Sequence, residues 1–273
     1  MTLERLDGLV LVGAGRMGSA LLEGWIANGL TPGAITVIDP SPGDAVRSTA
    51  QARGVRLLAD AGGLGRASIV ILAVKPQIMA DVLAGLGGLA DAATLALSIA
   101  AGRTIADIES GLGHEGAVVR AMPNTPAAIG HGMTVLVANA AASDAQRAAA
   151  GELMAAVGAV EWVGDEALMD AVTAVSGSGP AYVFLLAECL AEAGAAAGLE
   201  PQLALRLARE TVSGAGALIA AGADPPATLR RNVTSPGGTT EAALEVLMAK
   251  DGLAPMMRRA VLAARDRGRA LSG

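Results

Sequence analysis

Side chains that commonly carry acid–base or metal chemistry are scarce in this sequence. Its histidines, His114 and His131, lie in glycine-flanked stretches with no cysteine or acidic cluster at ligand spacing, so we expect no metal site. Its lysines, Lys75 and Lys250, belong to no phosphate-loop motif, and no serine lies in a nucleophile elbow. These absences disfavour hydrolase and nucleotide triphosphatase chemistry and favour a reaction that depends on a bound cofactor.

Aromatic residues, cysteine and excess positive charge are also lacking. Aromatics make up 1% of the chain, so backbone groups must do most of the ligand recognition. The net charge of -6 disfavours a nucleic-acid partner, whose phosphates require a basic surface. Cys189 stands alone and cannot form an internal disulfide, which fits a reducing compartment. No apolar run approaches the roughly 18 residues of a membrane helix. We therefore expect a cytoplasmic protein with no nucleic-acid and no membrane partner.

Glycine is abundant, and the first glycine cluster has a recognisable pattern. The apolar run 8–12 predicts a strand, the sequence Gly13-Ala14-Gly15-Arg16-Met17-Gly18 follows it, and an amphipathic helix comes next. This is the dinucleotide fingerprint in its expected context, with Ala14, Arg16 and Met17 between glycines that serve the turn, the pyrophosphate and the helix packing. A second predicted strand, 34–38, ends in Asp39, about 20 residues further on, where an acid accepts from a ribose hydroxyl.

Strand and helix signals alternate up to residue 163, and only helix signals follow. Further strands are predicted at 68–74, 94–99, 118–121, 133–138 and 160–163. The fold class predicted is therefore α/β, with an N-terminal Rossmann-type dinucleotide-binding domain over 1–163 and an all-helical C-terminal domain over 164–273. Ligands bind beyond the carboxyl ends of such strands, where Ala73–Pro76, Ala100–Ala101 and Asn124–Thr125 fall. The alternative is that these are ordinary loop residues and that Lys75 is a solvated charge.

The stretch 235–240, Ser-Pro-Gly-Gly-Thr-Thr, predicts a helix start that can bind an anion. Ser235 has the character of an N-cap and Pro236 of a first helical residue. The N–H groups of Gly237, Gly238, Thr239 and Thr240 would then cradle a small carboxylate, with a threonine hydroxyl left for a second polar atom. The alternative is an ordinary capped helix.

Several motifs occur in an order that resembles one family, the pyrroline-5-carboxylate reductases. They are Gly13–Gly18, Ala73–Pro76, Met122–Pro126, Val175–Tyr182 and Ser235–Thr240. The resemblance runs from residue 8 to near the end of the chain, and its last motif is specific to the family. It implies reduction of the cyclic imine 1-pyrroline-5-carboxylate to L-proline, the last step of proline biosynthesis, with NADPH or NADH. It also implies a homodimer with interlocked helical domains, often assembled further into a ring of dimers.

The resemblance assigns residues to both ligands. The cofactor would contact Gly13, Ala14, Gly15, Arg16, Met17, Gly18, Ser41, Ala73, Val74, Lys75, Pro76, Ala100, Ala101 and Asn232, and the substrate would contact Glu166, Thr239 and Thr240. The helical domain, 164–273, would hold substrate and form the dimer. The imine nitrogen is basic enough to be protonated, so Thr240 need only hold it while the imine carbon faces the nicotinamide. Many relatives favour NADPH, whereas Asp39 would face the 2′-phosphate and favours NADH.

Two other readings of the sequence stay open. A hydroxyacid dehydrogenase, or another imine reductase with the same two-domain plan, is one, although such dehydrogenases rely on a helical lysine and only Lys250 follows Lys75. A nucleotide-sensing protein without turnover is the other. It would keep Gly13–Gly18 but would have no use for Ser235–Thr240.

Overall fold

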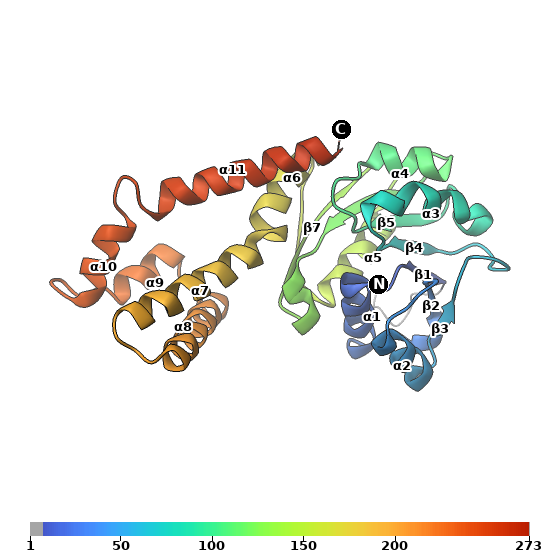
Figure 1. The fold of residues 1–273 in the computed structure, drawn as a ribbon. Helices are drawn as coiled ribbons and strands as arrows, with labels where there is room; N and C mark the ends of the chain where they lie inside the picture. The colour runs from blue at the N-terminus through green and yellow to red at the C-terminus, as the bar shows by residue number, and fades with distance from the viewer. Residues whose placement is uncertain (1–7, 273) are drawn as a thin grey trace. The chain divides into compact units, whose positions relative to one another are not determined.

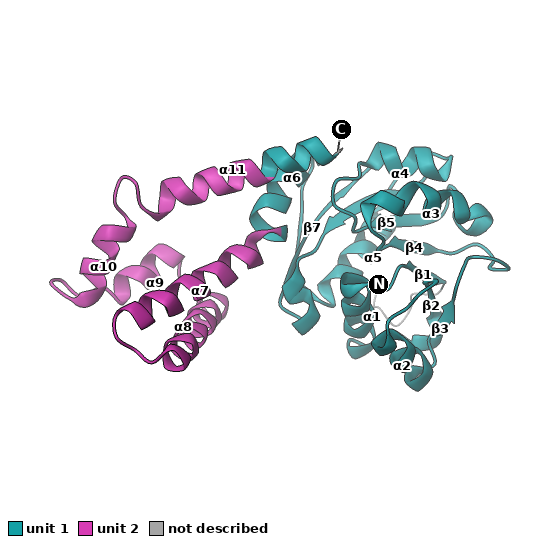
Figure 2. Ribbon diagram, viewed as in Figure 1, with its two compact units in different colours: residues 1–177, 265–273 teal, residues 178–264 magenta. Residues whose placement is uncertain are grey.

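The computed structural model describes residues 8–272, and Figure 1 shows the order of its elements. The chain divides into two compact units, coloured in Figure 2. The first unit contains Met1–Gly177 and Arg265–Gly273, and the second contains Ser178–Ala264. We describe each unit by itself.

The first unit is built on an eight-stranded sheet. Its strands are β1 (Leu9–Val12), β2 (Ile35–Ile38), β3 (Arg56–Leu58), β4 (Ile69–Leu72), β5 (Leu95–Ser98), β6 (Val118–Met122), β7 (Gly132–Ala138) and β8 (Gly158–Trp162). Their order is β3-β2-β1-β4-β5-β6-β7-β8. Strands β1 to β6 are parallel, β7 is antiparallel to β6, and β8 is parallel to β7. The chain reverses its direction of travel across the sheet at β1, which is the switch point where such sheets bind ligands.

Helices cover both faces of this sheet. They are α1 (Arg16–Ala27), α2 (Asp44–Arg53), α3 (Met79–Gly85), α4 (Ile105–Leu112), α5 (Asp144–Ala155) and α6 (Met169–Val172), and a π-helical turn (Thr173–Gly177) follows α6. Leu9 and Leu11 of β1 belong to one core cluster, with α1 and α5, and Val10 and Val12 belong to another, with α3 and α4. Both faces of the central strand are therefore buried, as expected for a parallel sheet.

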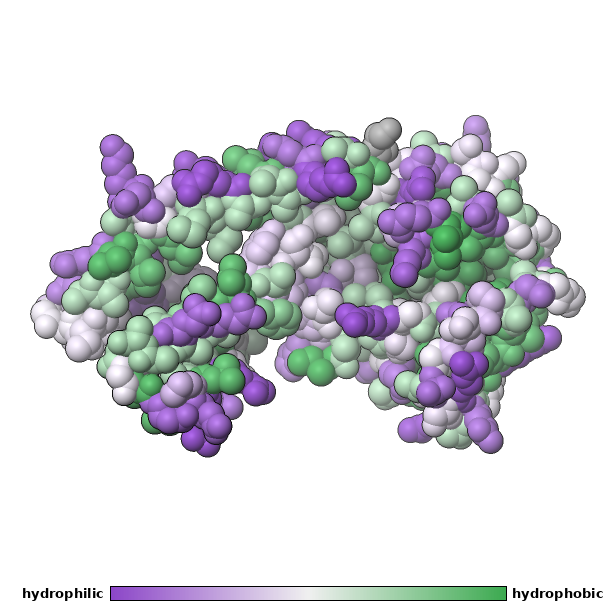
Figure 3. Space-filling view, viewed as in Figure 1, coloured by the Kyte–Doolittle hydropathy of each residue, from purple (hydrophilic) through white to green (hydrophobic). Residues whose placement is uncertain are grey.

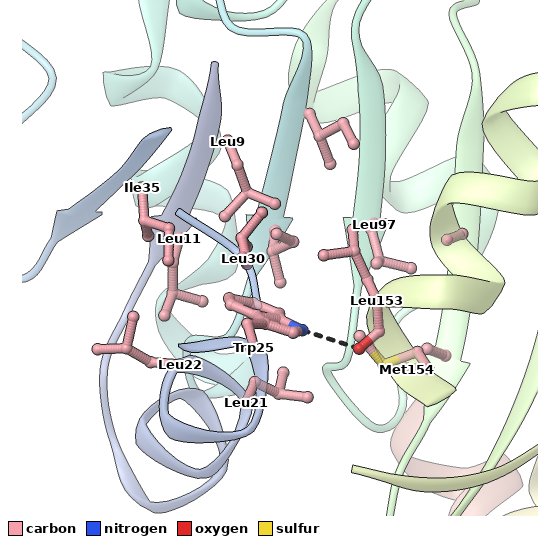
Figure 4. Packing of buried hydrophobic residues seen from close by; sticks show 14 of the residues in the cluster. Leu9, Leu11, Leu21, Leu22, Trp25, Leu30, Ile35, Leu97, Leu153 and Met154 are labelled. Carbon is pink, nitrogen blue, oxygen red and sulfur yellow. Dashed lines mark hydrogen bonds between the residues drawn. The ribbon is translucent and has the colours of Figure 1, made fainter. Parts of the chain in front are cut away.

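Trp25 anchors the larger of these core clusters. Its side chain is fully buried, and Figure 4 shows it among leucines from β1 and α1. The indole Nε1 donates a hydrogen bond of 2.8 Å to the carbonyl of Leu153 in α5. The one polar atom of the ring is thereby satisfied inside an apolar core, as a buried tryptophan requires.

The predicted fold class is confirmed, with local differences. Every predicted strand is present, most with ends shifted by one or two residues. The short strand β3 and the helices α2 and α4 were not predicted. The first compact unit also runs on past the expected boundary at 163/164, because Met169 of α6 is buried against Val135 and Val137 of β7. A functional division at residue 164 stays a prediction.

The second unit is helical and has little core of its own. It contains α7 (Gly179–Ala196), α8 (Pro201–Ala221), α9 (Pro226–Asn232), α10 (Thr239–Leu247) and most of α11 (Leu253–Ser272). Helices α7 and α8 approach closely at small residues, since a Cβ on Gly194 would lie 3.2 Å from that of Ala204. Among the described residues of these helices, the buried apolar ones are Ala204 and Ala208. Apolar surface is visible over the unit in Figure 3.

One helical stretch is long and apolar enough to cross a membrane by length and composition alone. It is Glu166–Ala196, with mean hydropathy 1.3 and 6% of its most apolar window buried. The expectation that no run approaches a membrane span is therefore wrong on this criterion. The stretch is interrupted by the π-helical turn and by Gly179-Pro180, and a single such helix is weak support for a membrane span.

Candidate active site

The glycine-rich loop after β1 has the geometry of a phosphate cradle. Gly13 has φ +89°, and a Cβ there would lie 2.7 Å from Cγ1 of Val74. Nothing lies within 4 Å of a Cβ on Gly15, so a ligand can approach the backbone there. A Cβ on Gly18 would collide with the carbonyl oxygen of Gly13. The three glycines thus serve the turn, the ligand approach and the close helix packing that the sequence predicts.

The start of α1 leaves backbone donors free for an anion. Gly15 is the N-cap and makes no side-chain cap hydrogen bond, and the first turn of α1 carries no acidic residue. The N–H groups of Gly15 to Gly18 therefore meet neither a capping side chain nor an acidic residue of the first turn of α1. Such a helix start, together with its dipole, suits a pyrophosphate.

Register brings four loops to the same edge of the sheet. The strand ends Val12, Ile38, Leu72 and Ser98 are successive register partners of neighbouring parallel strands. The predicted cofactor residues that follow these ends emerge side by side; they are Gly13–Gly18, Asp39 and Ser41, Ala73–Pro76, and Ala100 and Ala101. Asn232 is the last residue of α9 and belongs to the second unit.

Asp39 holds the glycine-rich loop with its own carboxylate. Oδ2 accepts a hydrogen bond of 2.8 Å from the N–H of Ala14, and Oδ1 accepts one of 2.8 Å from the N–H of Ser41. The side chain is half-buried, and each oxygen keeps a further lone pair. Any hydrogen bond that Asp39 accepts from a ribose hydroxyl would therefore come in addition to the two that fix this loop.

The loops after β4 and β6 differ in how they are held. Lys75 is exposed and directly precedes the turn at Pro76. Asn124, by contrast, is engaged within the first unit, since its Oδ1 accepts from the N–H of Met133 at 2.9 Å and its Nδ2 donates to the carbonyl of Ser176 at 3.2 Å. Asn124 thus joins β6 to β7 and to the π-helical turn, so its side chain has a structural role.

Glu166, expected at the substrate, lies in an ion pair in the first unit. Its Oε1 accepts from Nη1 of Arg120 at 2.5 Å and from the N–H of Ile105 at 2.8 Å. The side chains of Arg120 and Glu166 are 9% and 31% exposed. No role was predicted for Arg120, although a lone arginine inside the apolar strand β6 is a signal for a buried ion pair.

The start of α10 differs from the prediction. Gly238, and not Ser235, is the N-cap, and the helix begins at Thr239. Residues 235–238 form a turn closed by Gly238 N–H to Ser235 carbonyl at 3.0 Å, with Gly237 at φ +69°. Pro236 therefore takes the second position of a type II-like turn, which Pro-Gly favours, and not the first position of the helix.

This geometry also reduces the set of free donors. The Gly237 N–H donates to Oε2 of Glu241 at 2.7 Å, and the Gly238 N–H closes the turn. In the described part of the chain, the N–H groups of Thr239 and Thr240 have no acceptor, and both residues are exposed. A carboxylate cradle at this helix start would therefore use these two groups and the hydroxyls, and not the glycine N–H groups. Within residues 8–272, histidine, cysteine, aspartate and glutamate side chains form no group that could hold a metal ion.

A glycine-rich loop with free amides at the switch point of a doubly wound sheet defines a dinucleotide-binding protein of the Rossmann class. Residues 9–102 match a family described as NADP oxidoreductase, coenzyme F420-dependent. Residues 166–271 match a family described as pyrroline-5-carboxylate reductase dimerisation.

Relatives cover nearly the whole chain. A pyrroline-5-carboxylate reductase of Pseudomonas aeruginosa is 40% identical over 97% of this chain and 96% of its own length. One of Synechocystis is 42% identical, covering 96% and 97%. The structure of a pyrroline-5-carboxylate reductase from Coxiella burnetii matches with TM-score 0.91 and 38% identity, covering 98% of this chain and all of that one. The chain belongs to the pyrroline-5-carboxylate reductase family.

Two further structures widen the comparison. The Plasmodium falciparum pyrroline carboxylate reductase, solved with NADP bound, matches with TM-score 0.83 and 30% identity, covering 99% of each chain. Prephenate dehydrogenase of Aquifex aeolicus matches with TM-score 0.54 and 15% identity, which shows a shared fold alone. The similarity to an enzyme with NADP bound agrees with the geometry of the glycine-rich loop.

Proposed function

We propose that this chain reduces 1-pyrroline-5-carboxylate to L-proline with NADPH or NADH, the last step of proline biosynthesis. The observation that carries the proposal is the 40% identity to the Pseudomonas aeruginosa reductase across 97% of the chain. The glycine-rich loop, whose Gly15 leaves open space beside free helix amides, supplies the matching cofactor site.

The residues of the first unit bind and orient the cofactor. The N–H groups of Gly15 to Gly18 donate to its pyrophosphate, and Asp39 and Ser41 lie where the adenosine ribose is bound. Ala73–Pro76 and Ala100–Ala101, at neighbouring strand ends, line the approach to the nicotinamide. Bound NADPH or NADH supplies the hydride.

The residues of the second unit bind the substrate in this proposal. The Thr239 and Thr240 N–H groups at the start of α10 donate to the substrate carboxylate. The Thr240 hydroxyl holds the imine nitrogen, and Ser235, Gly237 and Gly238 shape the surroundings, while Asn232 contacts the cofactor. Because a protonated imine accepts hydride readily, positioning supplies most of the rate enhancement, and no histidine is needed.

The proposal extends to assembly and location. Residues 166–271 match a dimerisation family, and the second unit exposes large apolar side chains, including Phe184 (61% exposed) and Leu218 (64% exposed). We propose a homodimer formed through these helices, with a ring of dimers as the higher assembly. A homodimer also accounts for the apolar stretch Glu166–Ala196 without a membrane, in a cytoplasmic enzyme with no nucleic-acid partner.

A reductase assay tests the proposed function. Purified protein is mixed with NADPH and the cyclic imine, and the absorbance of the reduced cofactor is followed; the same is done with NADH and with a panel of 2-oxo and 3-oxo acids. We expect oxidation of the cofactor that depends on the imine. Turnover of an oxo acid alone would favour a hydroxyacid dehydrogenase. Such an enzyme relies on a helical lysine, whereas Lys250 lies exposed beyond the end of α10. Cofactor binding without any turnover would favour a nucleotide sensor.

A further inference from the structure

Two side chains hold the C-terminal end of the segment 99–104, which joins β5 to α4. Near that end, the guanidinium of Arg103 donates twice to the carbonyl of Pro76, from Nε at 3.0 Å and from Nη2 at 2.7 Å. Pro76 lies in the loop after β4 and Arg103 in the loop after β5, 27 residues further along the chain. The two hydrogen bonds therefore join two of the loops that emerge beside the glycine-rich loop.

Two residues further on, Glu166 holds Ile105, the first residue of α4. Its Oε1 accepts the N–H of Ile105, from a position 61 residues away in sequence, and the same oxygen pairs with Arg120. Arg120 is almost completely buried in β6, so the carboxylate is fixed by a cation that cannot move to solvent. Thr104 and Asp107 form a capping box at the same helix start, which leaves the Ile105 N–H for Glu166.

The backbone that leads from β5 to these anchors is fixed at its start by hydrogen bonds from the Ile99 N–H to the Leu72 carbonyl and from the Ala100 N–H to Oγ of Ser98. Residues 99–104 belong to neither strand nor helix, and Gly102 has φ +69°. The segment contains Ala100 and Ala101, which the proposed function places against the cofactor. A loop without its anchors would populate other conformations, and the apparent cofactor affinity would fall by the fraction that remains competent.

We propose that Arg103 and Glu166 are positioning residues for cofactor binding, which act through the carbonyl of Pro76 and the N–H of Ile105. Glu166 thereby acts on the cofactor loop and not by direct contact with the imine substrate. The inference rests on the proposed function only in taking NADPH as the cofactor.

A pair of arginine variants tests the first anchor. Arg103→Met is compared with Arg147→Met, because Arg147 also donates two hydrogen bonds to backbone carbonyls, those of Ala142 and Asn139. Since β7 is antiparallel to β6, residues 139–142 lie at the opposite edge of the sheet from the cofactor loops. Titration of NADPH without substrate should show about tenfold weaker binding for Arg103→Met, the size expected for losing hydrogen bonds from a charged donor. Arg147→Met should bind NADPH as tightly as wild type does. The NADPH affinity of Arg103→Lys should lie between those of wild type and Arg103→Met.

Glu166→Gln tests the second anchor and separates it from a substrate contact. We expect a raised NADPH dissociation constant with the imine KM at saturating NADPH within about twofold of wild type. In the double variant with Arg103→Met, the NADPH dissociation constant should rise by less than the product of the two single-variant factors, because both residues act on one segment. If burying an unpaired Arg120 prevents folding, Glu166→Asp, which keeps the charge but shortens the reach, replaces it.

Two results would overturn the proposal. Arg103→Met that binds NADPH as tightly as wild type would show that the loop needs no such anchor. A Glu166 variant with raised imine KM and unchanged NADPH affinity would place Glu166 at the substrate. Since NADPH binding is measured without substrate, a wild-type protein that binds NADPH but fails to reduce the imine would count against the proposed function alone.

Discussion

At the scale of single residues, Asp39 shows how one side chain can serve the fold and the ligand together. Its position after β2 was predictable, since a strand followed by an acid at this spacing is part of the dinucleotide pattern. Its hydrogen bonds to the N–H groups of Ala14 and Ser41 were not predictable, because they depend on the path of two loops. A carboxylate fixed in this way has one lone pair per oxygen left for ribose hydroxyls, and in the proposed binding mode it would lie close to a 2′-phosphate.

The first residue-scale prediction is that Asp39→Ser shifts cofactor preference towards NADPH. Loss of the carboxylate removes repulsion of the 2′-phosphate and also removes an acceptor for the ribose hydroxyls of NADH. We expect the ratio of kcat/KM for NADPH to that for NADH to rise by about tenfold, or ~1.4 kcal/mol. Steady-state kinetics with both cofactors measure it. Equal losses with both would show that Asp39 only holds the glycine-rich loop.

The second residue-scale prediction concerns Thr240. Thr240→Val keeps the volume of the side chain but removes the hydroxyl that is proposed to hold the imine nitrogen. A hydrogen bond to a charged group contributes about 1.5–3 kcal/mol, so kcat/KM for the imine should fall roughly ten- to a hundredfold. NADPH affinity, measured without substrate, should stay close to wild type. Unchanged turnover and imine KM would remove Thr240 from the mechanism.

At the scale of elements, the sequence predicted the sheet better than the helix starts. Buried parallel strands such as β1 and β4 are continuous apolar runs, so their presence and order could be read directly. Ser235–Thr240 could not be resolved, because Ser-Pro-Gly-Gly satisfies both an N-cap pattern and a type II turn. Only the fold decides between them, and it places the turn first and starts α10 at Thr239.

The element-scale prediction tests this turn through Gly237. Its φ of +69° is strained for any residue with a Cβ, although no atom lies within 4 Å of the added methyl group. Gly237→Ala should therefore cost roughly 1 kcal/mol of strain in the turn and raise the imine KM severalfold, with NADPH affinity unchanged. Gly43→Ala is the matched control, since Gly43 has φ −66° and equally open space. A Gly237→Ala enzyme indistinguishable from the Gly43→Ala control would contradict the role of the turn.

At the scale of the whole molecule, the second unit buries few of its described apolar side chains within itself. Its described apolar residues are mostly exposed, and a monomer rarely leaves so much apolar surface in contact with water. The alanine- and glycine-rich sequence of helices such as α7 favours close helix packing. It could not indicate which faces stay open, because that depends on how α7 to α11 pack.

The whole-molecule prediction is that the protein is at least a dimer at micromolar concentration. Burial of the exposed faces of residues 166–271 between two copies makes folding and association one process, so the melting temperature should rise with protein concentration. Light scattering and a dilution series of thermal melts measure both quantities. A fully active monomer with a melting temperature independent of concentration would contradict the proposed assembly.

The central claim, hydride transfer from the cofactor to the imine carbon, is tested most directly by isotope transfer. The protein is incubated with NADPH carrying deuterium at the transferable position of the nicotinamide and with unlabelled 1-pyrroline-5-carboxylate, and the product is analysed by mass spectrometry and NMR. We predict L-proline with one deuterium per molecule, on the carbon that was the imine carbon, and one cofactor oxidised per proline formed. Cofactor oxidation without labelled proline, or no proline at all under saturating substrates, would contradict the account.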